Sequence, residues 1–94
     1  MTDILAQVFA IIEDRKTNPK PGSYTNRLLD EGEDEIVKKI GEEAVEVILA
    51  AKGQGNERLI SELADLTYHC LVLLAQRGLS PDDVAAELAK RYNP

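Results

Sequence analysis

Two pairs of acidic residues have the types and the spacing to hold a metal ion. Glu43 and Glu46 lie three residues apart, and so do Glu62 and Asp65. Residues at that spacing are neighbours on one side of an α-helix. Hard divalent cations, Mg²⁺ above all, prefer such carboxylate oxygens. The four residues are therefore candidate Mg²⁺ ligands, and the alternative is that they form an ordinary solvated helix surface.

The segments that carry the acidic pairs are predicted to form an antiparallel helical hairpin. Apolar residues recur at helical spacing over about residues 33–52 and again over about residues 57–77. The Gly53–Asn56 turn between these segments is short, which favours antiparallel packing. Glu46 lies about seven residues before this turn and Glu62 about seven after it. All four carboxylates are therefore expected at one height of the hairpin, where a cation would relieve their repulsion.

The acidic residues of the first hairpin helix are predicted to lie on different sides of that helix. With about 100° of rotation per residue, Glu43 falls at the edge of the apolar arc of the first hairpin helix, and Glu42 falls on the far side. Lys39 shares the margin of Glu43 and Glu46, where it can pair with a carboxylate or meet a phosphate.

On the second hairpin helix, the apolar arc is predicted to centre on Leu63. Glu62, Asp65 and His69 form a polar strip along its margin. Cys70 falls inside the arc and is predicted to be a buried structural thiol.

Flanking helices are predicted on both sides of the hairpin. The first runs from Thr2, as its N-cap, to about Lys16, and the last opens at Ser80-Pro81 and ends near Tyr92. Between the first helix and the hairpin we expect a loop through Asn26 and a short turn at 27–30. No segment alternates long enough to be a strand. The prediction is a single all-α domain over residues 1–94.

Composition limits the class of partner. The 94 residues carry a net charge of -6, which argues against binding nucleic acid or an anionic membrane through a basic face. No apolar run is long enough for a membrane span. The single cysteine excludes an internal disulfide framework and, with no signal peptide recognised, favours the cytoplasm.

A homodimer is the expected assembly. A chain of this length has a thin core, and apolar residues lie outside the main arcs of both hairpin helices. These residues are Val45, Leu49, Val72 and Leu73. Burial from both sides predicts that two hairpins associate into a core like a four-helix bundle.

The chain resembles the phosphoribosyl-ATP pyrophosphatase family of the all-α, MazG-like NTP pyrophosphatases. The superfamily signature is similar to Glu42-Glu43-x-x-Glu46 followed by Glu62-x-x-Asp65. The narrower family is identified by the strings around it, which are Ser23-Tyr24-Thr25, Lys38 to Val47 and Asp65 to Leu74. The resemblance covers about residues 5–92. It implies Mg²⁺-dependent hydrolysis of phosphoribosyl-ATP to phosphoribosyl-AMP and pyrophosphate in histidine biosynthesis, by a cytoplasmic homodimer.

The resemblance also suggests roles for individual residues. Glu43, Glu46, Glu62 and Asp65 are the expected metal ligands, and Glu46 or Glu42 is the expected catalytic base. The expected substrate contacts are Lys16, Tyr24, Thr25, Arg27, Lys39 and His69. Each contact has a plainer alternative: the basic residues can be solvated, Tyr24 can pack on the core, and His69 can be an interface histidine.

Two other functions stay open at this stage. A housekeeping pyrophosphatase of dUTP, dCTP or damaged triphosphates would use the same acidic pairs. A non-enzymatic acidic helical adaptor would leave them solvated and indifferent to Mg²⁺.

Overall fold

The computed structural model describes residues 3–92, and all of its regular structure in that range is helical. This confirms the all-α prediction. The five helices within the described range are α1 (Ile4–Thr17), α2 (Tyr24–Glu31), α3 (Glu33–Gly53), α4 (Asn56–Gln76) and α5 (Pro81–Tyr92).

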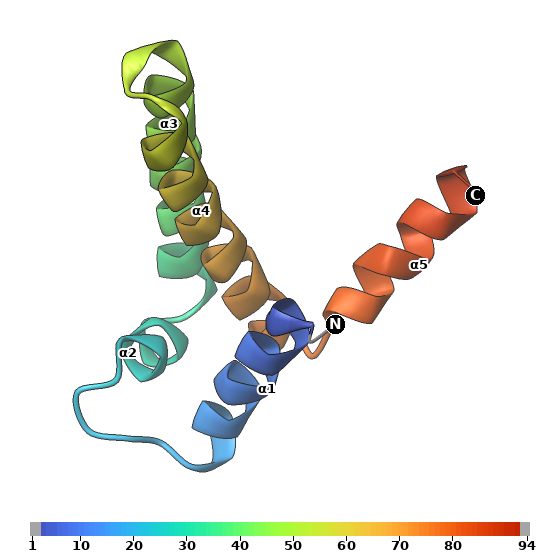
Figure 1. Cartoon of the computed structure of the whole chain (residues 1–94). Helices are drawn as coiled ribbons and strands as arrows, with labels where there is room; N and C mark the ends of the chain where they lie inside the picture. Colours follow the sequence, from blue (N-terminus) through green and yellow to red (C-terminus); the bar gives the residue numbers. More distant parts are fainter. Residues whose placement is uncertain (1–2, 93–94) are drawn as a thin grey trace.

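The predicted hairpin is the centre of the fold. Figure 1 shows α3 and α4 lying side by side along their length, with their connection at one end. Only Gln54 and Gly55 separate the two helices. Gly55 has a φ of 86°, a left-handed conformation that glycine adopts without steric cost, and α4 begins directly after it. The tight turn fixes the register in which the α3 and α4 carboxylates face each other.

The core lies at the open end of this hairpin, where α1 and α2 pack against it (Figure 1). Its most completely buried large side chains come from all four of these helices: Ile12, Leu28, Ile36 and Val72. Ala75 is also fully buried. The base of the hairpin is therefore well packed.

Helix α2 replaces the loop and short turn predicted for this part of the chain. The Ser23 side chain caps it by accepting a hydrogen bond from the Asn26 amide at 3.1 Å. Leu28 anchors it in the core at 1% exposure. Eight residues give too few apolar positions for a periodic signal, which explains the error.

The helix starts are partly as predicted. Thr2, the predicted first N-cap, lies outside the described residues. Asp3 caps α1, and its carboxylate accepts hydrogen bonds from the amides of Leu5 and Ala6. The last helix begins at Pro81 as predicted, and Asp83 accepts a 2.9 Å hydrogen bond from the Ser80 amide, which caps the start of α5.

The buried face of α4 is rotated from its predicted position. Leu63 is 42% exposed and Cys70 is exposed, so both burial predictions are wrong for the single chain. Val72, predicted to lie outside the main arc, is fully buried. Glu62 and His69 are also buried. Packing against α1, α2 and α3 buries the side of α4 that carries Glu62 and His69, and it leaves the Leu63 side exposed to solvent.

Helix α5 extends away from the other four helices (Figure 1). None of its residues is buried, and Val84 and Leu88 are about half exposed. Across residues 3–92, no helix combines the length and apolar character that crossing a membrane requires.

Candidate metal and substrate site

Three carboxylates from the two hairpin helices come together. Glu43 of α3 and Glu62 and Asp65 of α4 each offer one oxygen, and these oxygens lie within 4.8 Å of one another. Glu62 is buried, Glu43 is half-buried and Asp65 is exposed. The cluster is thus anchored on one side and open to solvent on the other. We call Glu43, Glu62 and Asp65 the carboxylate cluster.

Within residues 3–92, one basic side chain forms an ion pair with the cluster. Arg58 Nη2 lies 3.0 Å from Glu62 Oε1, one helical turn away on α4. A single, largely exposed guanidinium leaves much of the charge of three carboxylates uncompensated. Converging oxygen donors with excess negative charge suit a hard divalent cation. Sequence reasoning missed Arg58, although its i, i+4 spacing to Glu62 was a usable signal.

The other predicted acidic residues lie outside the cluster. Glu46 is half-buried on α3 and is not one of the three converging residues. Glu42 is exposed, as helical phase predicts, and its Oε1 lies 3.6 Å from Lys39 Nζ. The structure therefore brings together three of the four predicted ligands.

Residue Tyr24, at the start of α2, is linked to α4 through His69. The Tyr24 hydroxyl lies 2.9 Å from His69 Nε2. His69 Nδ1 lies 2.7 Å from the backbone oxygen of Asp65, a residue of the carboxylate cluster. A continuous chain of contacts therefore joins α2 to the cluster.

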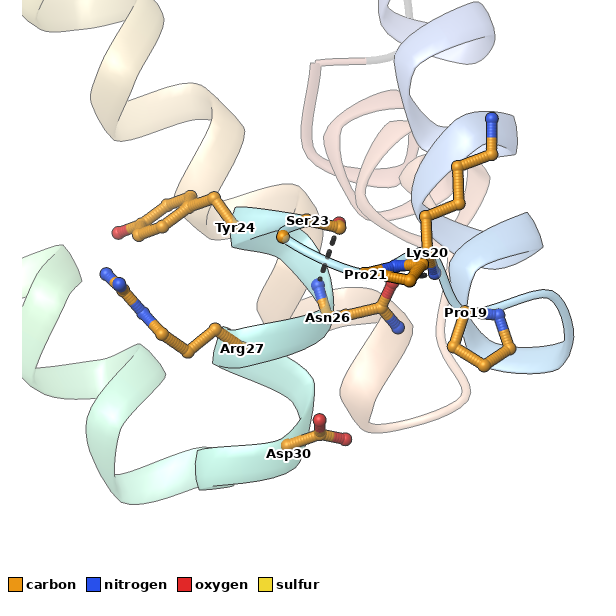
Figure 2. Close-up of a pocket in the computed structure, with 9 residues that line it drawn as sticks. Pro19, Lys20, Pro21, Ser23, Tyr24, Asn26, Arg27 and Asp30 are labelled. Atoms are coloured by element: carbon orange, nitrogen blue, oxygen red, sulfur yellow. Dashed lines mark hydrogen bonds between the residues drawn. The ribbon is translucent and has the colours of Figure 1, made fainter.

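The phenol of Tyr24 lies among charged groups. The Arg27 guanidinium carbon is 5.1 Å from the centre of the Tyr24 ring, a cation–π distance. Figure 2 shows the two side chains extending from α2 beside each other, away from Pro19 and Lys20. Burial raises the pKa of Tyr24, while nearby Lys39 opposes that shift. The charges of Arg27 on α2 and of Lys39 and Glu43 on α3 therefore all act on the Tyr24 phenol.

A pocket of about 620 Å³ lies between α2 and the loop before it. Figure 2 shows its lining, which includes Lys20, Ser23, Asn26 and Asp30. Asn26 holds the loop in place, since its Oδ1 accepts from the Lys20 amide and its Nδ2 donates to the Arg15 carbonyl. This pocket offers space beside Tyr24 and Arg27 for part of a ligand.

Thr25 and Lys16 make contacts within the chain. The Thr25 hydroxyl is hydrogen-bonded to the hydroxyl of Tyr68. Lys16 Nζ donates to the Ala75 carbonyl at 2.9 Å. Ala75 follows Asp65 by ten residues of α4, which is about 15 Å along a helix. The structure therefore places Lys16 far from the carboxylate cluster.

Comparison with known proteins gives one consistent result. Residues 5–92 match the family model described as phosphoribosyl-ATP pyrophosphohydrolase. A phosphoribosyl-ATP pyrophosphatase of Pelotomaculum thermopropionicum is 55% identical over 95% of this chain and 91% of its own length. Proteins of the same name from Bacillus thuringiensis and Bacillus mycoides are 48% and 50% identical, over 97% of this chain and 85% of their own. The chain, with its helical hairpin and carboxylate cluster, belongs to the phosphoribosyl-ATP pyrophosphohydrolase family.

Proposed function

We propose that this chain hydrolyses phosphoribosyl-ATP to phosphoribosyl-AMP and pyrophosphate, as the names of its relatives indicate. Water adds to the α-phosphorus, the α–β phosphoanhydride bond breaks, and pyrophosphate leaves. The observation that carries the proposal is the carboxylate cluster. In it, two helices of a chain that belongs to this family bring three carboxylate oxygens together. Such donors suit a phosphoanhydride hydrolase that works with a divalent cation.

The proposed cation is Mg²⁺, held by Glu43, Glu62 and Asp65. When bound, it supplies charge neutralisation for phosphate oxygens and an oriented water. The ion pair with Arg58 holds the buried Glu62 carboxylate in place beside the other two. Glu46, one turn from Glu43 on α3, is proposed as a fourth ligand or as the base that accepts the proton of the attacking water. Glu42 remains the alternative base and would act from outside the cluster.

The substrate's phosphates are proposed to lie between the cluster and α2. Arg27 and Lys39 are two cations beside this space, because both act on the Tyr24 phenol. Their charges can neutralise phosphate oxygens that the carboxylates themselves repel. The pocket beside α2 is proposed to take a part of the substrate that extends beyond these phosphates. Lys16 and Thr25 remain predicted substrate contacts, although each already has a partner within the chain.

The test is release of pyrophosphate from phosphoribosyl-ATP and from a panel of dNTPs, each with and without Mg²⁺. We expect release from phosphoribosyl-ATP only, and only with Mg²⁺. Release from dNTPs alone would support a housekeeping pyrophosphatase. No release from any substrate would support the adaptor.

A matched pair of variants tests the cluster itself. Glu62→Gln keeps the size of the side chain but removes a charged donor, and we expect turnover to fall by about 100-fold or more. Glu57→Gln makes the same chemical change at an exposed position of α4 outside the cluster, so it should act like the wild type. Equal activity of the two variants would contradict the metal assignment.

A homodimer is proposed as the working form. Large apolar side chains are half exposed on both helices of the hairpin, among them Val45, Ile48, Leu49, Ile60 and Leu63. Burying such a face between two copies removes this apolar surface from water. Light scattering is expected to give twice the 10.4 kDa chain mass. A clean monomer at micromolar concentration would contradict the proposal.

A further inference from the structure

His69 is buried, and both of its ring nitrogens have partners. It is 5% exposed, so its ring has almost no surface to offer to a substrate. The rings of Tyr24 and Tyr68 pack edge-on against it, with centroids 5.8 and 5.2 Å away. It is also the only histidine of the chain.

The partners of the two nitrogens define the tautomer. A backbone carbonyl only accepts hydrogen bonds, so the Nδ1 atom that faces the Asp65 oxygen at 2.7 Å carries a hydrogen. In the tautomer that carries this hydrogen, Nε2 is the acceptor. The Tyr24 hydroxyl then donates to Nε2, at 2.9 Å.

We propose that His69 is a positioning residue that fixes the start of α2 to the α4 turn carrying Asp65. This inference rests on the proposed function. Through the Tyr24 hydroxyl, His69 determines where the Tyr24 ring lies, and Arg27 lies over that ring. The Nδ1–H bond to the Asp65 carbonyl fixes the imidazole relative to the carboxylate cluster. The role replaces the direct substrate contact predicted for His69 from the sequence.

Two substitutions at His69 separate its two hydrogen bonds. In His69→Gln, the amide oxygen reaches the position of Nε2 and can accept from Tyr24. In His69→Asn, the amide nitrogen replaces Nδ1 and nothing accepts from Tyr24. We expect His69→Asn and Tyr24→Phe each to raise KM for phosphoribosyl-ATP roughly tenfold, the scale of one buried hydrogen bond, with a smaller change in kcat.

His69→Gln is expected to keep KM within about threefold of the wild type, because the acceptor is restored. The double variant Tyr24→Phe/His69→Asn should be no worse than either single variant, since both remove the same bond. Additive effects, or an equal loss in His69→Gln and His69→Asn, would overturn the proposal.

A spectroscopic test does not depend on the substrate. With ¹⁵N-labelled histidine, the single His69 gives two ring-nitrogen signals that report which nitrogen carries a hydrogen. We expect a protonated Nδ1 and a bare Nε2, and a shift of the Nε2 signal in Tyr24→Phe. A protonated Nε2 would overturn the assignment. If the wild type fails to hydrolyse phosphoribosyl-ATP but shows the expected signals, the proposed function fails and the link between α2 and α4 stands.

Discussion

The guanidinium group of Arg77 donates two hydrogen bonds to the carboxylate of Glu33. Nε lies 2.6 Å from Oε1 and Nη2 lies 2.8 Å from Oε2, which is the paired geometry that arginine and a carboxylate favour. Glu33 is the first residue of α3 and Arg77 follows the last residue of α4. The ion pair therefore closes the open end of the hairpin, next to the core.

This ion pair predicts a pH dependence of stability. The Arg77 guanidinium lowers the pKa of Glu33 below its ordinary value of 4.5. A carboxyl with a lowered folded-state pKa contributes stability above its unfolded pKa, and this contribution is lost as pH falls through the folded value. Glu33→Gln should therefore lower the Tm at pH 7, and the difference from the wild type should shrink below about pH 4. Thermal melts that show the same difference at both pH values would contradict the assignment.

Removing Arg58 should make stability more dependent on Mg²⁺. Without its guanidinium, the buried Glu62 lacks its cation partner and repels the rest of the carboxylate cluster, which should cost about 1 kcal/mol for a pair with one exposed member. A bound divalent cation neutralises the charge that Arg58 no longer compensates. The rise in Tm on adding Mg²⁺ should therefore be larger in Arg58→Gln than in the wild type.

The control for Arg58 lies on α5. Arg91 and Glu87 form an ion pair of the same i, i+4 spacing at 2.9 Å, away from the carboxylate cluster. Arg91→Gln should show the wild-type response to Mg²⁺. An equal increase in both variants would show that the effect is not specific to the cluster.

Graded truncation of Ile36 tests the location of the core. The side chain is fully buried in a core cluster with residues of α1, α2 and α4. Ile36→Val should cost about 1 kcal/mol of unfolding free energy and Ile36→Ala about 3 kcal/mol, because the larger deletion leaves the larger cavity. Urea unfolding at one fixed protein concentration measures both. A cost of Ile36→Ala below that of Ile36→Val would be inconsistent with this packing.

Cys70 provides a probe of the proposed homodimer. It is exposed in the single chain, and Leu63 lies two turns before it on α4, on the same side. Leu63→Lys should give monomers, and Cys70 should then react faster with a thiol reagent than in the wild type. Desolvation raises the pKa of Cys70 above its ordinary value of 9.0, so the reaction should be followed at alkaline pH. Unchanged mass and unchanged reactivity would place the interface elsewhere.

The two long helices and their turn were predictable because each helix carries several turns of apolar periodicity and ends at a glycine or within two residues of one. The three residues of the carboxylate cluster followed from that geometry, since matching heights in a hairpin depend on chain spacing. The rotation of α4 was not predictable. Both the Leu63 side and the Val72 side are apolar, and the choice between them depends on α1 and α2, whose packing no local pattern encodes.

The burial of His69 follows from the same cause. A histidine at the margin of an apolar arc can point to solvent or into a contact, and only the position of Tyr24 decides between them. That position depends on α2, a helix of eight residues whose local signal is weak. The sequence motifs therefore indicated the three residues of the carboxylate cluster, but they did not indicate the contacts that position Tyr24 and His69 beside it.

Gly32 both ends α2 and begins α3, and its φ of 95° is one that other residues rarely adopt. Because Gly32 is the single residue between the two helices, the number of residues fixes the rotational position of Arg27 on α2 relative to Glu43 on α3. One inserted residue would turn one helix by about 100° against the other and misalign them. Insertions and deletions among natural or engineered variants should therefore be rejected at Gly32.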